Sequence, residues 1–62
     1  ASANKGCLGG QFNLGDLYNQ LGDKKMALEW LQKAFETAKK EKNSEKMKEI
    51  QETIEEVKNS QK

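Results

Sequence analysis

Small and large apolar residues recur every three or four positions along residues 14–57, and the pattern is interrupted only twice, at residues 21–23 and 43–44. A period near 3.6 residues indicates amphipathic α-helices rather than strands. The 62-residue chain contains no proline that would break such helices. The sequence therefore predicts an all-α fold, a helical hairpin followed by a third amphipathic helix, over residues 9–21, 24–41 and 45–59.

The two interruptions hold residues that end and begin helices. Gly22 can take the positive φ that closes a helix, and the side chain of Asp23 can accept a hydrogen bond from the start of the next one. Asn43 and Ser44 are equally good capping residues. We therefore expect two short turns between antiparallel helices.

The apolar stripes of the three helices differ in width. The first helix has one stripe, which we interpret as its buried face, and the second is apolar over more than half of its circumference, which predicts neighbours on two sides. The third has a narrow stripe, as is typical of the last helix of a stack. The stripes consist of Leu14, Leu17, Tyr18 and Leu21; of Met26, Ala27, Leu28, Trp30, Leu31, Ala34, Phe35 and Ala38; and of Met47, Ile50, Ile54 and Val57.

Three small residues, Gly15, Ala27 and Ala34, stand among these larger ones. Small residues let two helices approach closely, and larger neighbours such as Tyr18 and Leu31 then fill the remaining space. We therefore expect the first two helices to cross where Gly15 meets Ala27.

Composition argues against several classes of function. Histidine is absent and Cys7 is the only cysteine, so the chain can form neither an internal disulfide nor a complete zinc site. We expect an inert thiol in a reducing, cytoplasmic compartment, since only Lys5 is near enough in sequence to activate it. The net charge is +1 and the lysines of residues 39–48 alternate with glutamates, so we expect neither nucleic acid nor a membrane as a partner.

The inventory of residues also argues against an enzyme. No serine has a base at a plausible spacing, and no glycine-rich loop suits a phosphate group. We expect so small a body to have no room for a pocket of about 300 Å³. The sequence therefore predicts no catalytic residue, no cofactor and no metal.

The spacing of the small and large residues resembles that of a tetratricopeptide repeat over about residues 3–40. The matching residues are Leu14, Gly15, Tyr18, Ala27, Leu31 and Ala34, with Gly22 and Asp23 in the expected turn. Residues 11–15 and 27–34 also resemble a Sel1-like repeat, although the turn is short, as in a tetratricopeptide repeat. Gln11 replaces a frequent aromatic residue and Lys39 a frequent proline, which fits a terminal repeat.

The resemblance implies a fragment of an α-α superhelix that works as a protein-interaction scaffold. It divides the chain into a flexible N-terminal segment at residues 1–8, one repeat at 9–41, and a C-terminal capping helix with a polar tail at 42–62. Because the chain begins without methionine, we expect a piece of a longer repeat protein. Its partner would be another protein or a peptide.

In this family, ligands usually bind the concave face that the first helices line. On the first helix that face would present Phe12, Asp16, Asn19 and Gln20. The three polar residues are otherwise merely solvated, and Phe12 either contacts a partner or packs on a preceding repeat. Trp30 is either an interface anchor or a partly buried residue that covers the helix surface. An alternative function is self-association, as a dimer or a helix-swapped oligomer, which would cover the flank of the first helix.

Overall fold

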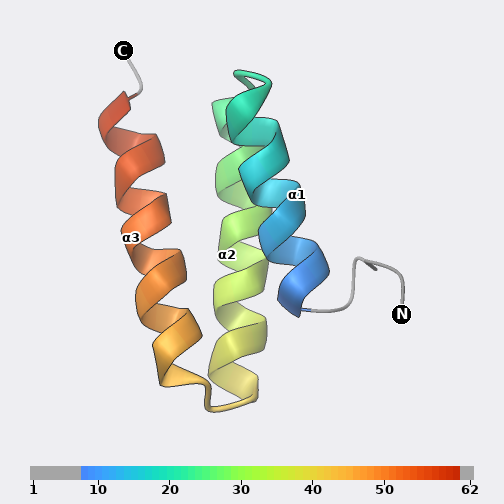
Figure 1. The fold of residues 1–62 in the computed structure, drawn as a ribbon, viewed down its shortest axis with the longest axis vertical. Helices are drawn as coiled ribbons and strands as arrows, with labels where there is room; N and C mark the ends of the chain where they lie inside the picture. Colours follow the sequence, from blue (N-terminus) through green and yellow to red (C-terminus); the bar gives the residue numbers. More distant parts are fainter. Residues whose placement is uncertain (1–7, 61–62) are drawn as a thin grey trace.

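The structure is a computed structural model that describes residues 8–60. In this part of the chain it consists of three antiparallel α-helices joined by two tight turns (Figure 1). The predicted all-α class is confirmed, and the predicted bounds agree within one residue at each end. Residue 8, which the sequence assigned to the N-terminal segment, begins the first helix; the rest of that segment, with Cys7, lies outside the described residues. The helices are α1 (Leu8–Gln20), α2 (Lys24–Lys40) and α3 (Ser44–Ser60).

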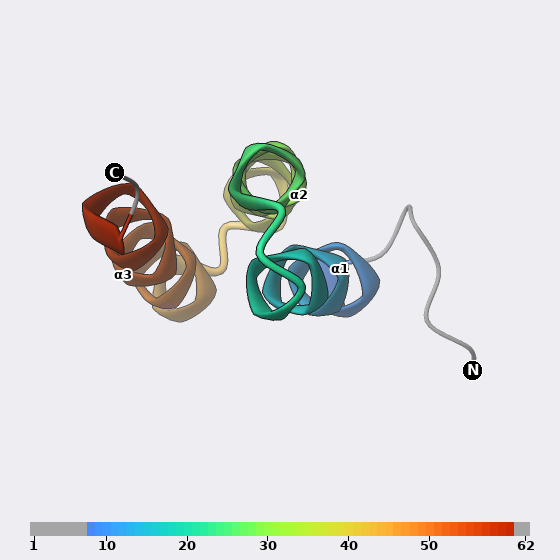
Figure 2. The ribbon, with the colours of Figure 1, turned by 90° about the horizontal axis from the view of Figure 1, so that it is seen from above.

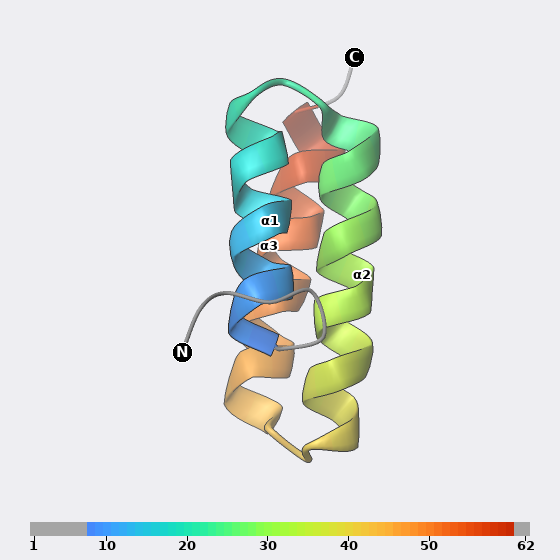
Figure 3. The same cartoon turned by 90° about the vertical axis from the view of Figure 1, so that its right-hand side faces the viewer.

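Helix α2 is the middle layer, as its wide apolar surface predicted. It packs against both α1 and α3. Viewed from above, α1 and α3 lie on the same side of α2, so that the three helices form an open V rather than a flat row (Figure 2). Figure 3 shows α1 and α2 side by side, with α3 behind them.

The first turn follows the predicted chemistry. Gly22 has φ +89°, and its N–H donates to the carbonyl oxygen of Asn19 at 3.1 Å. The next N–H, from Asp23, donates to the carbonyl of Tyr18 at 2.9 Å, which closes α1. The Asp23 carboxylate then accepts a hydrogen bond from the N–H of Met26 at 3.3 Å and caps α2.

The second turn uses one predicted residue and one that was not predicted. The Asn43 side chain accepts a hydrogen bond from the N–H of Lys46 at 3.2 Å and caps α3. Just before it, Lys42 takes the left-handed conformation with φ 56°, the role that glycine has in the first turn. A lysine in this conformation costs about 1–2 kcal/mol, and sequence pattern gives no sign of it.

The core lies along α2 and the inner side of α3. Seven apolar side chains are buried there, and six more pack against them while remaining partly exposed. The buried stripe of α3 is the predicted one, with Met47 half-buried at its edge. The buried residues are Ala27, Leu31, Ala34, Ala38, Ile50, Ile54 and Val57; the partly buried ones are Leu8, Phe12, Tyr18, Leu28, Phe35 and Met47.

Helix α1 turns its small residues to α2, as predicted for Gly15. A Cβ atom at Gly15 would lie 2.8 Å from both Cγ and Cδ2 of Leu31, and 3.3 Å from the carbonyl oxygen of Ala27. Leu31 therefore occupies the space that a side chain at Gly15 would need. The predicted crossing of Gly15 and Ala27 is confirmed.

The predicted buried stripe of α1 is largely wrong. Leu17 is 49% exposed and Leu21 is 70% exposed, and Leu14 is only half-buried. The buried residues of α1 are instead Gly10, Gln11 and Gly15. Because each residue turns the helix by about 100°, contact at Gly15 places the leucines on a flank of α1 rather than toward α2.

Gln11 is buried because it has a specific partner. Its exposed fraction is 9%, and its Oε1 accepts a hydrogen bond from Oγ1 of Thr37 on α2 at 2.6 Å. The same Oγ1 atom of Thr37 also lies 3.1 Å from the backbone carbonyl oxygen of Lys33, one turn earlier in α2. Where the repeat pattern often has an aromatic residue, this chain thus joins α1 and α2 by a polar contact.

We predict that Gly15→Ala lowers the free energy of unfolding by about 1–3 kcal/mol, because the new methyl group overlaps Leu31. Gly9→Ala is the matched control, since Gly9 is exposed in the same helix and a Cβ there meets nothing within 4 Å. The control should gain about 0.5–1 kcal/mol through higher helix propensity. Thermal melts followed by circular dichroism measure both, and a Gly15→Ala variant as stable as the wild type would contradict the packing.

We predict that Thr37→Val costs about 1–3 kcal/mol, because it leaves the buried Gln11 oxygen without a donor. Gln11→Leu in the same chain should recover most of that loss, since the buried polar group is then gone. Urea unfolding of the two single variants and the double variant gives the coupling energy. Additive effects of the two substitutions would show that the hydrogen bond contributes nothing.

Candidate protein-binding surface

The four predicted site residues lie on one side of α1. Phe12, Asp16, Asn19 and Gln20 are spaced i, i+4, i+7 and i+8, which places them on a common helix face. This face turns toward α3, because the Lys46 ammonium lies 5.3 Å from the centroid of the Phe12 ring. We call the surface formed by these four residues and Lys46 the α1–α3 face.

Phe12 is half-buried and packs against the core cluster. Its neighbour across the fold is therefore α3, the helix that follows in the same chain. The Lys46 ammonium above the ring contributes a cation–π contact of about 0.5–1 kcal/mol. Lys46 also pairs with Glu49 at 3.3 Å, an exposed contact of little energetic weight. The exposed part of the ring remains accessible to a partner.

The polar members of the face are held by local hydrogen bonds. The Gln20 amide donates to the Asp16 carboxylate at 3.1 Å, one turn earlier. The side-chain amide oxygen of Asn19 accepts a hydrogen bond from the Lys24 ammonium at 2.6 Å, across the first turn. Side chains that are already ordered lose less conformational entropy when a ligand binds. The face thus offers an aromatic edge, a carboxylate, two amides and the Lys46 ammonium, with the Lys24 ammonium next to it.

The sequence-based prediction comprised the four α1 residues of this face and included neither Lys46 nor the neighbouring Lys24. Lys46 was interpreted as part of a solvated run of alternating charges. Its position over Phe12 depends on how α3 returns along α2, and residues 34 positions apart carry no local signal of such a contact. Lys24 stands at the beginning of α2, where only the turn geometry brings it to Asn19.

Trp30 is half-buried in α2, in agreement with the interpretation as a partly buried residue. The Lys33 ammonium lies 5.5 Å from the centroid of its ring system. The indole nitrogen is shielded from solvent and has no hydrogen-bond partner among residues 8–60. A buried N–H without a partner costs about 1–3 kcal/mol, which lowers the net stabilisation gained from burying Trp30.

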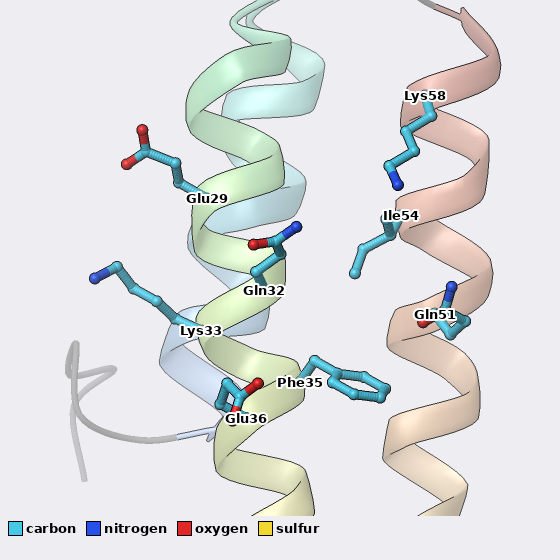
Figure 4. A pocket seen from close by; sticks show the side chains of 8 residues that line it. All are labelled: Glu29, Gln32, Lys33, Phe35, Glu36, Gln51, Ile54 and Lys58. Carbon is cyan, nitrogen blue, oxygen red and sulfur yellow. The ribbon is translucent and has the colours of Figure 1, made fainter.

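A second surface is a groove between α2 and α3 (Figure 4). Its volume of about 630 Å³ contradicts the expectation that the body is too small for a pocket. The groove is open to solvent, because Ile54 is its only buried lining residue, Phe35 is half-buried and the other six are exposed. The lining residues are Glu29, Gln32, Lys33, Phe35, Glu36, Gln51, Ile54 and Lys58.

The described residues provide no group for metal chemistry. Within residues 8–60, no three His, Cys, Asp or Glu side chains come together as a metal ion would require. Likewise, none of the helices in this range is long and apolar enough to cross a membrane.

The hairpin is the part of the chain that matches a known family. Residues 9–41, more than half of the 62 residues, match the family model of the tetratricopeptide repeat. The chain belongs to the tetratricopeptide repeat family. Tetratricopeptide repeats mediate protein–protein interactions. The Sel1-like resemblance stays a prediction. No curated protein and no solved structure matches the chain significantly.

Proposed function

We propose that this chain is a non-catalytic scaffold that binds a segment of another protein on its α1–α3 face. The observation that carries the proposal is the convergence of Phe12 and Lys46, from two helices, beside an ordered pair of polar side chains, Asp16 and Gln20. An aromatic edge surrounded by fixed hydrogen-bonding groups is the composition of a protein interface.

The charge distribution supports this choice of surface. Charged residues make up 34% of the chain, yet Asp16 is the only one in the 13 residues of α1. Ionised groups are depleted in the centres of protein interfaces because they must lose water when a partner binds. Helix α1 can therefore be covered by a partner at a lower desolvation cost than α2 or α3.

The position of α3 supports the proposal that it caps the array. Its single apolar stripe is used against α2, and most of its remaining residues are exposed lysine, glutamate or glutamine. At the opposite flank, Leu17 and Leu21 of α1 stay in contact with water. An array with one polar end and one apolar end is what a terminal repeat of a longer protein needs, since the apolar end can receive a preceding repeat.

The α1–α3 face is tested by a pull-down in which the tagged chain is compared with a Phe12→Ala and Asn19→Ala double variant. The double variant should recover about tenfold less of the specific partners, a loss of roughly 1.4 kcal/mol. A Lys48→Ala and Glu52→Ala variant is the control, because both residues are exposed on α3 outside the face. Equal recovery by the wild type and the double variant would refute the proposed face.

A second candidate function, self-association, is favoured by the exposed leucines of α1. Pairing of two copies along Leu14, Leu17 and Leu21 would remove an apolar stripe from water. We predict that the wild type sediments as a dimer at high micromolar concentration and that a Leu17→Lys variant sediments as a monomer. A monomeric wild type in analytical ultracentrifugation would rule this function out.

A further inference from the structure

The groove between α2 and α3 shares no residue with the α1–α3 face. Two apolar side chains, Phe35 from α2 and Ile54 from α3, point toward each other across it and form its floor (Figure 4). A volume of about 630 Å³ lies within the range of ligand-binding sites, about 300–1,000 Å³. The groove can therefore take at least one large apolar side chain with its neighbours.

The charges around this floor are divided between the two helices. On α3, the Lys58 ammonium extends into the groove above Ile54, and it forms no ion pair within residues 8–60 (Figure 4). On α2, Glu36 is an acidic lining residue. Glu29 and Lys33 also line the groove, but their charged ends point away from α3 (Figure 4). The groove thus has one basic residue, Lys58, on its α3 side and one acidic residue, Glu36, on its α2 side.

Two primary amides lie on the two sides of the groove. Gln32 comes from α2 and Gln51 from α3 (Figure 4). The Gln51 nitrogen donates to Glu55 at 3.3 Å, which leaves its carbonyl oxygen available as an acceptor. Gln32 makes no side-chain hydrogen bond in the part of the chain described. An extended peptide has free N–H and C=O groups that need such partners, whereas a helix satisfies its own.

We propose that the α2–α3 groove binds an extended segment of a partner protein in which an apolar residue stands between an acidic and a basic one. The apolar side chain lies on Phe35 and Ile54, the acidic residue pairs with Lys58, and the basic residue meets Glu36. This inference rests on the proposed scaffold function and adds a second binding surface to it.

The geometry of an extended backbone sets the spacing of these residues. Side chains two residues apart lie on the same side of an extended chain. The acidic, apolar and basic side chains can therefore all face the groove when they occupy alternate positions of a five-residue segment.

The test uses the ¹⁵N-labelled full chain and a synthetic peptide, acetyl-Gly-Asp-Ser-Leu-Ser-Lys-Gly-amide. Saturable chemical-shift changes are expected at the lining residues, including the side-chain amides of Gln32 and Gln51, with a Kd of about 1 mM. A matched peptide in which serine replaces leucine should produce no saturable change. Shift changes confined to Phe12, Asp16 and Asn19 would overturn the groove while supporting the α1–α3 face.

Charge variants separate binding from folding. Lys58→Glu should weaken the peptide at least about fivefold, whereas Lys48→Glu, the same change on the exposed side of α3 outside the groove, should alter the Kd less than about twofold. A peptide with lysine in place of its aspartate should bind Lys58→Glu better than it binds the wild type. Far-ultraviolet circular dichroism confirms that both variants keep their helices. Equal affinity of the two variants, or absence of shift changes up to about 10 mM peptide, would overturn the proposal.

Discussion

The contact of Leu31 with the bare backbone at Gly15 determines how the rest of the molecule is arranged. With no side chain at Gly15, α1 lies close enough to α2 for Leu31 to fill the crossing. This contact fixes the rotation of α1 about its own axis. Phe12 then turns toward α3, while Leu17 and Leu21 turn to solvent. One missing side chain thus selects which residues of α1 can meet a partner.

Helix α2 carries the second constraint, because it must serve two neighbours at once. A row of alanines lets α1 and α3 approach it, and Leu31 and Phe35 extend to either side of that row. The hydrogen bond between Gln11 and Thr37 constrains how α1 is oriented on α2, in addition to the close packing of their side chains. Both surfaces proposed for binding include residues of α3. Their geometry therefore depends on α2, against which both α1 and α3 pack.

Much of the fold could be read from the sequence because its signals are local. Helix bounds, the turn at Gly22 and the middle position of α2 follow from spacing and capping chemistry. The burial of α1 was mispredicted because large apolar residues were counted, although the smallest residue decides where two helices touch. The contact of Phe12 with Lys46 and the α2–α3 groove join residues far apart in sequence, and no periodicity reports the path of α3.

The polarity of α3 bears on the kind of ligand that the α2–α3 groove can take. A further helix packed on α3 would cover Gln51 and Lys58 without giving their amide and ammonium groups a partner, because the backbone of a helix is already hydrogen-bonded. Covering these groups without partners costs desolvation free energy, which opposes the apolar contact that Phe35 and Ile54 offer. An extended segment brings its own unpaired backbone groups and side-chain charges to the same residues. We therefore expect the polar side of α3 to favour an extended peptide over a packed helix in the proposed α2–α3 groove.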